Sequence, residues 1–303
     1  MGFSFLDKKV KLKIGFLISY DYKYLPDALR VVYQYADEII IAIDKNRMSW
    51  AGKKYDFDEC FLDQIQSTDS QNKISLFQEN FYMPELTPME NEVRERNLLS
   101  EKMGPDCWQL QIDSDEYFLQ FDEVYAFLQK NSFLVRRPDV NPVSIRANWI
   151  TLFKQTENGF LYIDNEENFP FATNLTAKYY VGRDMGARHN DEVVTDFQAL
   201  HHSWARTPEE IYQKITNWGH KDDFDGEAFF KVWKGIDEGN YTEFVDFHPI
   251  YKGAWHKLNF IACSDVADFM QKFNAIHPSP KPTRLQRKYI RAYRKATGKF
   301  WVR

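Results

Sequence analysis

The chain has 303 residues, 44% hydrophobic and 27% charged, which fits one large folded α/β unit or such a unit with a smaller appendage. No apolar run approaches the ~20 residues of a membrane-spanning helix, so we expect no integral membrane segment. The formal net charge is −5, and the charges are unevenly distributed: residues 281–303 contain nine Lys or Arg and no acid, whereas acids are in excess elsewhere. Because most of the chain is acidic, we expect no broad binding of nucleic acid.

A strand, a helix and a second strand are predicted near the start of the chain. Residues 11–18 are apolar enough for a buried strand and stop at the polar Ser19-Tyr20-Asp21. Residues 25–36 have the apolar spacing of a helix, and the apolar run 38–43 ends at Asp44. This order implies two parallel strands joined by a right-handed crossover, and ligands collect at the carboxyl ends of such strands. We therefore expect Asp44 and the loop at Ser19 to lie beside a ligand.

The rest of the chain continues to alternate between strands and helices. Residues 45–79 are polar and irregular, with a short strand at 74–77. Beyond them we expect helices at 90–103, 121–130 and 207–218, strands at 107–112 and 144–153, and a polar loop over 183–192. No internal repeat and no clear linker divides the chain. These elements predict an α/β fold with a mixed, mostly parallel central sheet flanked by helices.

An acidic motif, Asp113-Ser114-Asp115-Glu116, follows the strand at 107–112. Alternate side chains at a strand end point the same way, so Asp113 and Asp115 can face one point. Two converging carboxylates repel unless a cation neutralises them, and Mn²⁺ or Mg²⁺ held by carboxylates and substrate phosphates would do so. Such an ion stabilises the charge that grows on a departing diphosphate. The alternative is a solvated turn in which the motif occurs by chance.

Two further polar groups precede the acidic motif. Arg94, Arg96 and Asn97 lie on the predicted helix just before its strand, where an arginine can hold a diphosphate. The alternative is a solvated helix face. Asp44 could bind the base or ribose of a nucleotide, or be a solvated strand end.

The late part of the chain contains His201-His202 and a pair of acids. A strand would point the two histidines to opposite faces, so at most one of them should be a metal ligand. Asp191 and Glu192 are candidates for the general base that deprotonates an acceptor hydroxyl. Acids in a solvated loop are the alternative.

Together these motifs resemble the ordered motifs of family 2 glycosyltransferases, which have the GT-A (Rossmann-like) fold. The resemblance is clearest over residues 11–130 and thinner to about residue 220, and the motifs that carry it are Ser19-Tyr20, Asp44, Arg96-Asn97, Asp113-Ser114-Asp115-Glu116 and His201-His202-Ser203-Trp204. The run Arg188-His189-Asn190-Asp191-Glu192 before the histidines is similar to the branch that contains bacterial lipopolysaccharide-core glucosyltransferases.

The resemblance implies a role for each matching residue. It implies an inverting sugar transfer from a nucleoside-diphosphate sugar, with a UDP-sugar favoured, to a glycan or lipid-linked acceptor. The roles it implies are nucleotide-sugar binding by Ser19, Tyr20, Asp44, Arg96 and Asp113, metal binding by Asp113, Asp115 and His201, and base catalysis by Asp191 or Glu192. The sequence departs from the family in the long region 45–90 and in the base motif, which reads Asn-Asp-Glu instead of the expected His-Glu.

The resemblance also divides the chain into a GT-A nucleotide-sugar-binding and catalytic domain, residues 1–222, and a helical C-terminal region, residues 223–303. The basic end of the latter, 281–303, also carries aromatic and aliphatic residues, so it could be an amphipathic segment on an anionic membrane surface. A solvated terminal helix is the alternative. The start of the chain lacks a signal-peptide pattern, and the three cysteines form no C-x-x-C pair. We therefore expect a cytoplasmic protein, peripheral on the inner face of the membrane.

Two other functions use some of the same residues. A metal-dependent phosphoryl or nucleotidyl transferase also clusters carboxylates, but the chain has no phosphate loop of the P-loop type. A non-catalytic carbohydrate- or lipid-binding module would explain the 17% aromatic content without turnover.

Overall fold

The computed structural model describes residues 9–185, 191–217, 223–277 and 300–301 of the chain. Its strands are β1 (Lys11–Leu17), β2 (Glu38–Asp44), β3 (Ile74–Glu79), β4 (Cys107–Asp113), β5 (Glu116–Phe118), β6 (Val143–Gln155), β7 (Gly159–Thr173), β8 (Asp191–His201), β9 (Asn259–Ala262) and β10 (Phe300–Trp301). Its α-helices are α1 (Leu25–Val32), α2 (Cys60–Ser67), α3 (Pro88–Met103), α4 (Phe121–Lys130), α5 (Pro208–Asn217), α6 (Gly226–Gly235) and α7 (Val266–Ile276). Short 3-10 helices are η1 (Tyr22–Tyr24), η2 (Ser132–Leu134) and η3 (Tyr241–Glu243).

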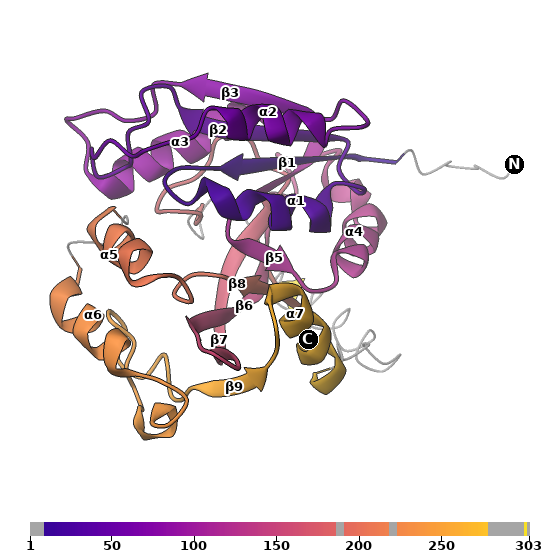
Figure 1. Cartoon of the computed structure of the whole chain (residues 1–303). Helices are drawn as coiled ribbons and strands as arrows, with labels where there is room; N and C mark the ends of the chain where they lie inside the picture. The colour runs from indigo at the N-terminus through magenta and orange to yellow at the C-terminus, as the bar shows by residue number, and fades with distance from the viewer. Residues whose placement is uncertain (1–8, 186–190, 218–222, 278–299, 302–303) are drawn as a thin grey trace, which may run out of the picture.

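The strands of the described residues form one mixed sheet flanked by helices (Figure 1), which confirms the predicted α/β class. The order across it is β10-β8-β6-β7-β4-β1-β2-β3, with β5 beside β8 and β9 beside β7. The neighbours β4, β1, β2 and β3 are all parallel. The strand-helix-strand order at 11–44 therefore pairs as predicted, and the carboxyl ends of three long parallel strands meet at one edge.

Alternating side chains divide this parallel part between two layers of helices. Leu12, Ile14 and Phe16 of β1 belong to the main core, which also holds the buried faces of α1, α2, α4 and α7. Leu17 packs on the other side with Leu99 of α3. The side chain of that leucine lies so close to β1 that a Cβ on Gly15 would come within 2.7 Å of its Cδ2. Glycine thus allows α3 to lie directly on the strand.

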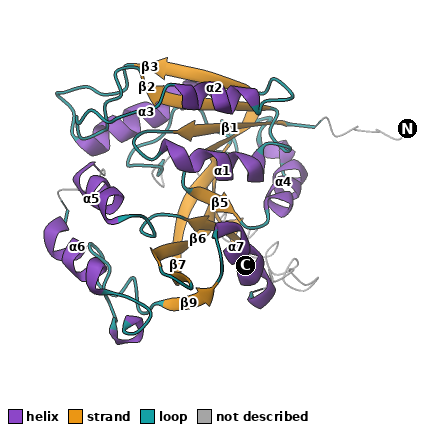
Figure 2. Ribbon diagram, viewed as in Figure 1, coloured by secondary structure: helices purple, strands orange, loops and turns teal. Residues whose placement is uncertain are grey.

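The other half of the sheet contains the long antiparallel pair β6 and β7, of which the sequence predicted only β6, over 144–153 (Figure 2). Strand β7 was not predicted, and neither was α2 within the stretch expected to be irregular. The expected loop 183–192 is wrong at its end, because Asp191 and Glu192 already pair with β6 as the first residues of β8. Residues 186–190 lie outside the described part.

The C-terminal region is not wholly helical. It contains α6 and α7, but β9 pairs with β7 and β10 pairs with β8, so both strands extend the same sheet. Of the predicted amphipathic tail, only Phe300 and Trp301 are described, and they form a strand. Within the described ranges, no helix is both long and apolar enough to cross a bilayer.

Candidate functional site

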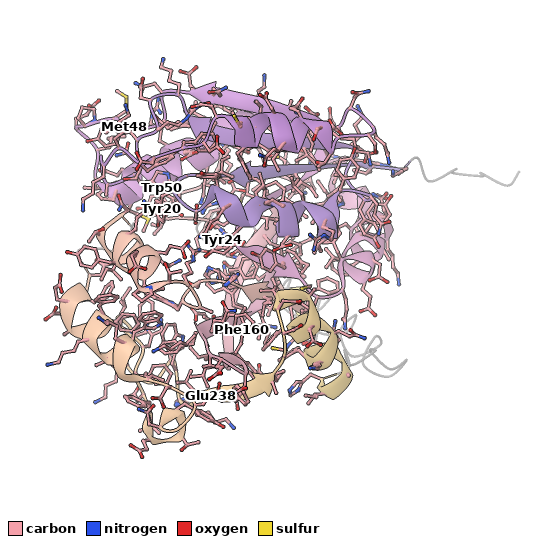
Figure 3. The ribbon with its side chains drawn as sticks, in the orientation of Figure 1. Tyr20, Tyr24, Met48, Trp50, Phe160 and Glu238 are labelled. Carbon is pink, nitrogen blue, oxygen red and sulfur yellow. The ribbon has the colours of Figure 1, made fainter. Side chains whose placement is uncertain are left out.

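A cavity of about 350 Å³ opens at the carboxyl ends of β1, β2 and β4. Helices α3 and α5, strands β6 and β7, and a segment before β9 complete its walls. Most of the residues predicted from the sequence line it, namely Ser19, Tyr20, Asp44, Arg96, Asp113, Asp115 and His201. Trp50 lines the same cavity as Tyr20, and both residues are labelled in Figure 3. The fold therefore brings these residues, which are far apart in the chain, to one cavity.

Backbone pairing brings the acidic motif and the late histidine together. The chain turns after Asp113 into β5, whose Glu116 lies opposite His201 of the antiparallel β8. The backbone N–H of His202 donates to the carbonyl of Asp115 at 2.8 Å. As a result, His201 Nε2 lies 3.6 Å from Asp115 Oδ2.

The two histidines face opposite ways, as strand alternation predicted. His201 lines the cavity, whereas His202 is buried with Nε2 2.8 Å from the carbonyl of Ala205. Burial, aided by the nearby Arg206 charge, lowers the pKa of His202 to about 4. A neutral ring at physiological pH donates through Nε2, so His202 has a structural role.

Asp113 is held by two buried arginines. Its carboxylate is 3.2 Å from Arg96 and 2.5 Å from Arg183. Burial acts to raise its pKa, but the two guanidinium groups outweigh it and hold the pKa of Asp113 below its ordinary value. Asp113 is therefore a carboxylate at neutral pH.

Asp115 is also buried, with 4% of its side chain exposed. Arg206 donates to its Oδ2, and Lys214 Nζ lies 3.9 Å away. Burial opposes ionisation, but His201, Arg206 and Lys214 together hold the pKa of Asp115 well below the ordinary value. Burial and the charge of Arg206 lower the pKa of Lys214 to about 8.

Glu116 connects the two sides of the site. This buried carboxylate accepts hydrogen bonds from Arg183 at 2.8 and 2.9 Å, and from the indole Nε1 of Trp149 at 2.9 Å. It also accepts the backbone N–H of Asp113 at 3.0 Å. Trp149 in turn stacks on His201, with ring centroids 4.9 Å apart. Glu116 thus orients Asp113 through Arg183, and His201 through Trp149.

The described residues bring two potential metal donors of the predicted set together at the cavity, not a complete metal site. Within the described residues, no group of three or more His, Cys, Asp or Glu side chains is arranged to hold a metal ion. Asp115 and His201 supply one carboxylate and one imidazole to the cavity. Mg²⁺ is usually held by one or two carboxylates together with substrate phosphates and water, so a cation here would need oxygens from the substrate.

Two polar atoms that line the cavity region lack a hydrogen-bond partner among the described residues. One is Nη1 of Arg96, whose side chain otherwise binds Glu92 and Asp113. Arg96 is 1% exposed, so the alternative of a solvated helix face is wrong for this residue. The other is the hydroxyl of Tyr55, which is 6% exposed. Buried donors without partners are costly, so these two atoms are candidates to bind a ligand.

Asp44 has a structural role that the sequence did not indicate. Its two oxygens accept four backbone N–H groups, from Asn46, Met48, Phe81 and Tyr82, at 2.8 to 3.2 Å. The carboxylate is 3% exposed, so it is not a solvated strand end. It fixes two loops that form one end of the cavity.

The two base candidates lie at the start of β8. Glu192 is not among the residues that line the cavity, and its exposed carboxylate pairs with Arg146 at 3.2 Å. Arg146 does line the cavity, so Glu192 is connected to it through one side chain. The backbone of Asp191 is described as part of β8, opposite Val143.

Several residues of the site were missed from the sequence. Arg206 and Lys214 compensate Asp115 from beyond the histidines, and Glu167 and Asn168 enter the cavity from the unpredicted β7. The helix-start pattern at Thr207 could have indicated that α5 begins near the site, but no local pattern links a lysine on it to Asp115.

No protein-family model and no curated protein matches this chain.

Proposed function

We propose that the protein is a metal-dependent inverting glycosyltransferase with a GT-A fold, which moves a sugar from a nucleoside-diphosphate sugar to an acceptor hydroxyl. The observation that carries the proposal is the convergence of Asp113, Asp115 and His201 at the carboxyl ends of parallel strands, in one cavity with Ser19 and Tyr20. In sheets of this kind ligands bind at that edge.

The donor's nucleotide would occupy the end of the cavity formed by β1, β2 and the loop after β2. Tyr20 and Trp50 offer aromatic surface there, and the Tyr55 hydroxyl offers a hydrogen bond. The diphosphate would lie near Arg96, whose Nη1 is a buried donor in need of an acceptor. A guanidinium is well suited to phosphate because it is planar and permanently charged.

Asp115 and His201, assisted by Asp113, would hold Mn²⁺ or Mg²⁺. When bound, this ion stabilises the negative charge of the departing diphosphate. In the transfer, the acceptor oxygen forms a bond to the anomeric carbon as the bond from that carbon to the diphosphate breaks. The acceptor's proton would pass to Asp191 or Glu192.

A metal-independent binding module is the second candidate, and the arginine pairs favour it. Arg96 and Arg183 already neutralise Asp113, and Arg206 neutralises Asp115. In that case a nucleotide or sugar would bind equally well with EDTA present, and no turnover would follow.

The test is thermal stability of the purified protein with a panel of nucleoside diphosphates, in Mn²⁺ and in EDTA. A ligand at 100 times its dissociation constant adds roughly 2.7 kcal/mol of stability. The proposal predicts that one diphosphate stabilises the wild type only with metal and that Asp115→Asn loses the effect. Equal stabilisation in EDTA would support the binding module instead. If no diphosphate stabilises the protein, both the glycosyltransferase and a nucleotide-binding module are refuted.

A further inference from the structure

The C-terminal region contributes one wall of the cavity, which the proposed donor contacts do not use. Residues 248–251 and Trp255 line the same cavity as Asp113 and Asp115. They lie in the segment between α6 and β9, which is drawn in orange in Figure 1.

This wall is a built structure. The carboxylate of Asp246 accepts the backbone N–H of Gly253, whose φ of +81° favours glycine. His248 Nδ1 accepts the backbone N–H groups of Ile250 and Tyr251 at 3.0 and 2.8 Å. A neutral imidazole with two such donors at Nδ1 carries its proton on Nε2, so His248 is also a donor.

The wall presents ring faces beside a carboxylate. The His248 ring is 4.4 Å from the Trp255 ring and 5.2 Å from the Tyr251 ring. Trp255 is buried in a separate hydrophobic cluster with Trp204 and Trp233, while Tyr251 is 58% exposed. The indole Nε1 of Trp255 donates to Glu167 Oε2 at 3.5 Å, and Glu167 also lines the cavity.

This combination matches a sugar ring better than an acyl chain or a peptide. A pyranose has an apolar face of C–H groups that packs on aromatic rings, and a rim of hydroxyls that donate to a carboxylate. An acyl chain offers no hydroxyl groups to the Glu167 carboxylate, so it would exchange water at that carboxylate for apolar surface.

We propose that His248, Tyr251, Trp255 and Glu167 form a subsite for a saccharide acceptor. The inference rests on the proposed function and makes it more specific, because it assigns the acceptor's chemistry: a sugar ring binds here with a hydroxyl directed toward the donor. The ring faces supply affinity, and Glu167 accepts hydrogen bonds from the sugar hydroxyls.

Two measurements test the subsite. The first is saturation-transfer NMR on the protein without donor, with a panel of methyl pyranosides and disaccharides. The second is release of nucleoside diphosphate from the donor sugar as the same saccharides are titrated. We compare wild type with Tyr251→Ala, Tyr251→Phe and Glu167→Gln, and with Tyr212→Ala as a control, because Tyr212 is a 46% exposed tyrosine on α5 that does not line the cavity.

We expect at least one saccharide to bind and to accelerate diphosphate release. Tyr251→Ala and Glu167→Gln should each raise its KM roughly tenfold, equivalent to about 1.4 kcal/mol, whereas Tyr251→Phe and Tyr212→Ala should not. Stabilisation of Tyr251→Ala by nucleoside diphosphate shows that this variant is folded.

The outcomes separate the two proposals. If saccharides bind through Tyr251 but no donor is cleaved, the subsite stands and the glycosyltransferase proposal fails. If the donor is cleaved but only an amphiphilic alcohol accelerates release, or if Tyr251→Ala and Glu167→Gln keep the wild-type KM, the saccharide subsite is refuted.

Discussion

Replacing Glu116 by Gln tests how the site is held together. The Glu116 side chain is fully buried and accepts two hydrogen bonds from Arg183 and one from Trp149. The amide of Gln keeps the shape but removes the charge, and turns an N–H₂ group toward donors. Breaking a buried ion pair costs about 3–5 kcal/mol. Because Asp113 still pairs with Arg183, we expect the lower value, about 3 kcal/mol.

The assay is thermal unfolding, with Glu192→Gln as the matched control. At about 2.1 cal/mol/K of unfolding entropy per residue, about 3 kcal/mol corresponds for 303 residues to a fall in Tm of roughly 5 °C. Glu192 makes the same kind of contact, to Arg146 at 3.2 Å, but with 46% of its side chain exposed, so its loss should cost less than about 1 kcal/mol. If both variants melt within about 2 °C of the wild type, the ion pair of Glu116 with Arg183 does not stabilise the site. The proposed role of Glu116 in orienting Asp113 and His201 is then wrong.

Three further predictions follow from the structure. Burial raises the pKa of Glu95 to about 8, above its unfolded value, so the contribution of Glu95 to stability falls by about 1.4 kcal/mol per pH unit between about pH 4.5 and 8. In urea unfolding, Glu95→Gln should therefore be more stable relative to wild type at pH 8 than at pH 4.5. The same stability difference between the two proteins at both pH values would contradict this. Gly15→Ala should lower the free energy of unfolding by about 1–3 kcal/mol, because the added methyl group would meet a leucine of α3 at 2.7 Å. The control Gly235→Ala, with nothing within 4 Å of the added group, should lose no stability. Equal melting temperatures of the two variants would show that α3 can shift. Either Asp191→Asn or Glu192→Gln should lower the rate of sugar transfer roughly 100-fold or more while diphosphate binding persists, and normal transfer by both would place the base elsewhere.

The parts of the fold that the sequence predicted are those where local pattern and burial agree. The β1-α1-β2 unit has apolar runs at 14–18 and 39–43 that stop at polar residues, because these strands are covered by helices on both faces. Strand β4 stops in the same way at Asp113. The acidic motif was therefore readable as a strand end, and its position at the cavity followed from the sheet.

Strand β7 was missed because its sequence serves the cavity as well as the sheet. Its apolar ends are separated by a polar stretch that includes Glu167 and Asn168, both of which line the cavity. This breaks the alternation that marks a strand. Helix α2 was missed because its buried face of Phe61, Leu62 and Ile65 is too short to show a period.

The charge balance of the site could not be read from the sequence. Arg183 and Arg206 reach Asp113 and Asp115 across gaps of roughly 70 to 90 residues, and nothing in their neighbours marks them as partners. The antiparallel pairing of β5 with β8 brings His201 and the segment after it beside the acidic motif. Compensation of buried charges is a tertiary property, set by which strands are adjacent.

The most direct test of the central claim is to follow a nucleoside-diphosphate sugar by phosphorus NMR with Mg²⁺, wild type against Asp115→Asn. A glycosyltransferase releases intact nucleoside diphosphate, and we predict that this release requires both the metal and Asp115. Release of nucleoside monophosphate or inorganic phosphate would indicate nucleotidyl or phosphoryl transfer instead. Diphosphate release that persists in EDTA or in Asp115→Asn would contradict the proposed metal site.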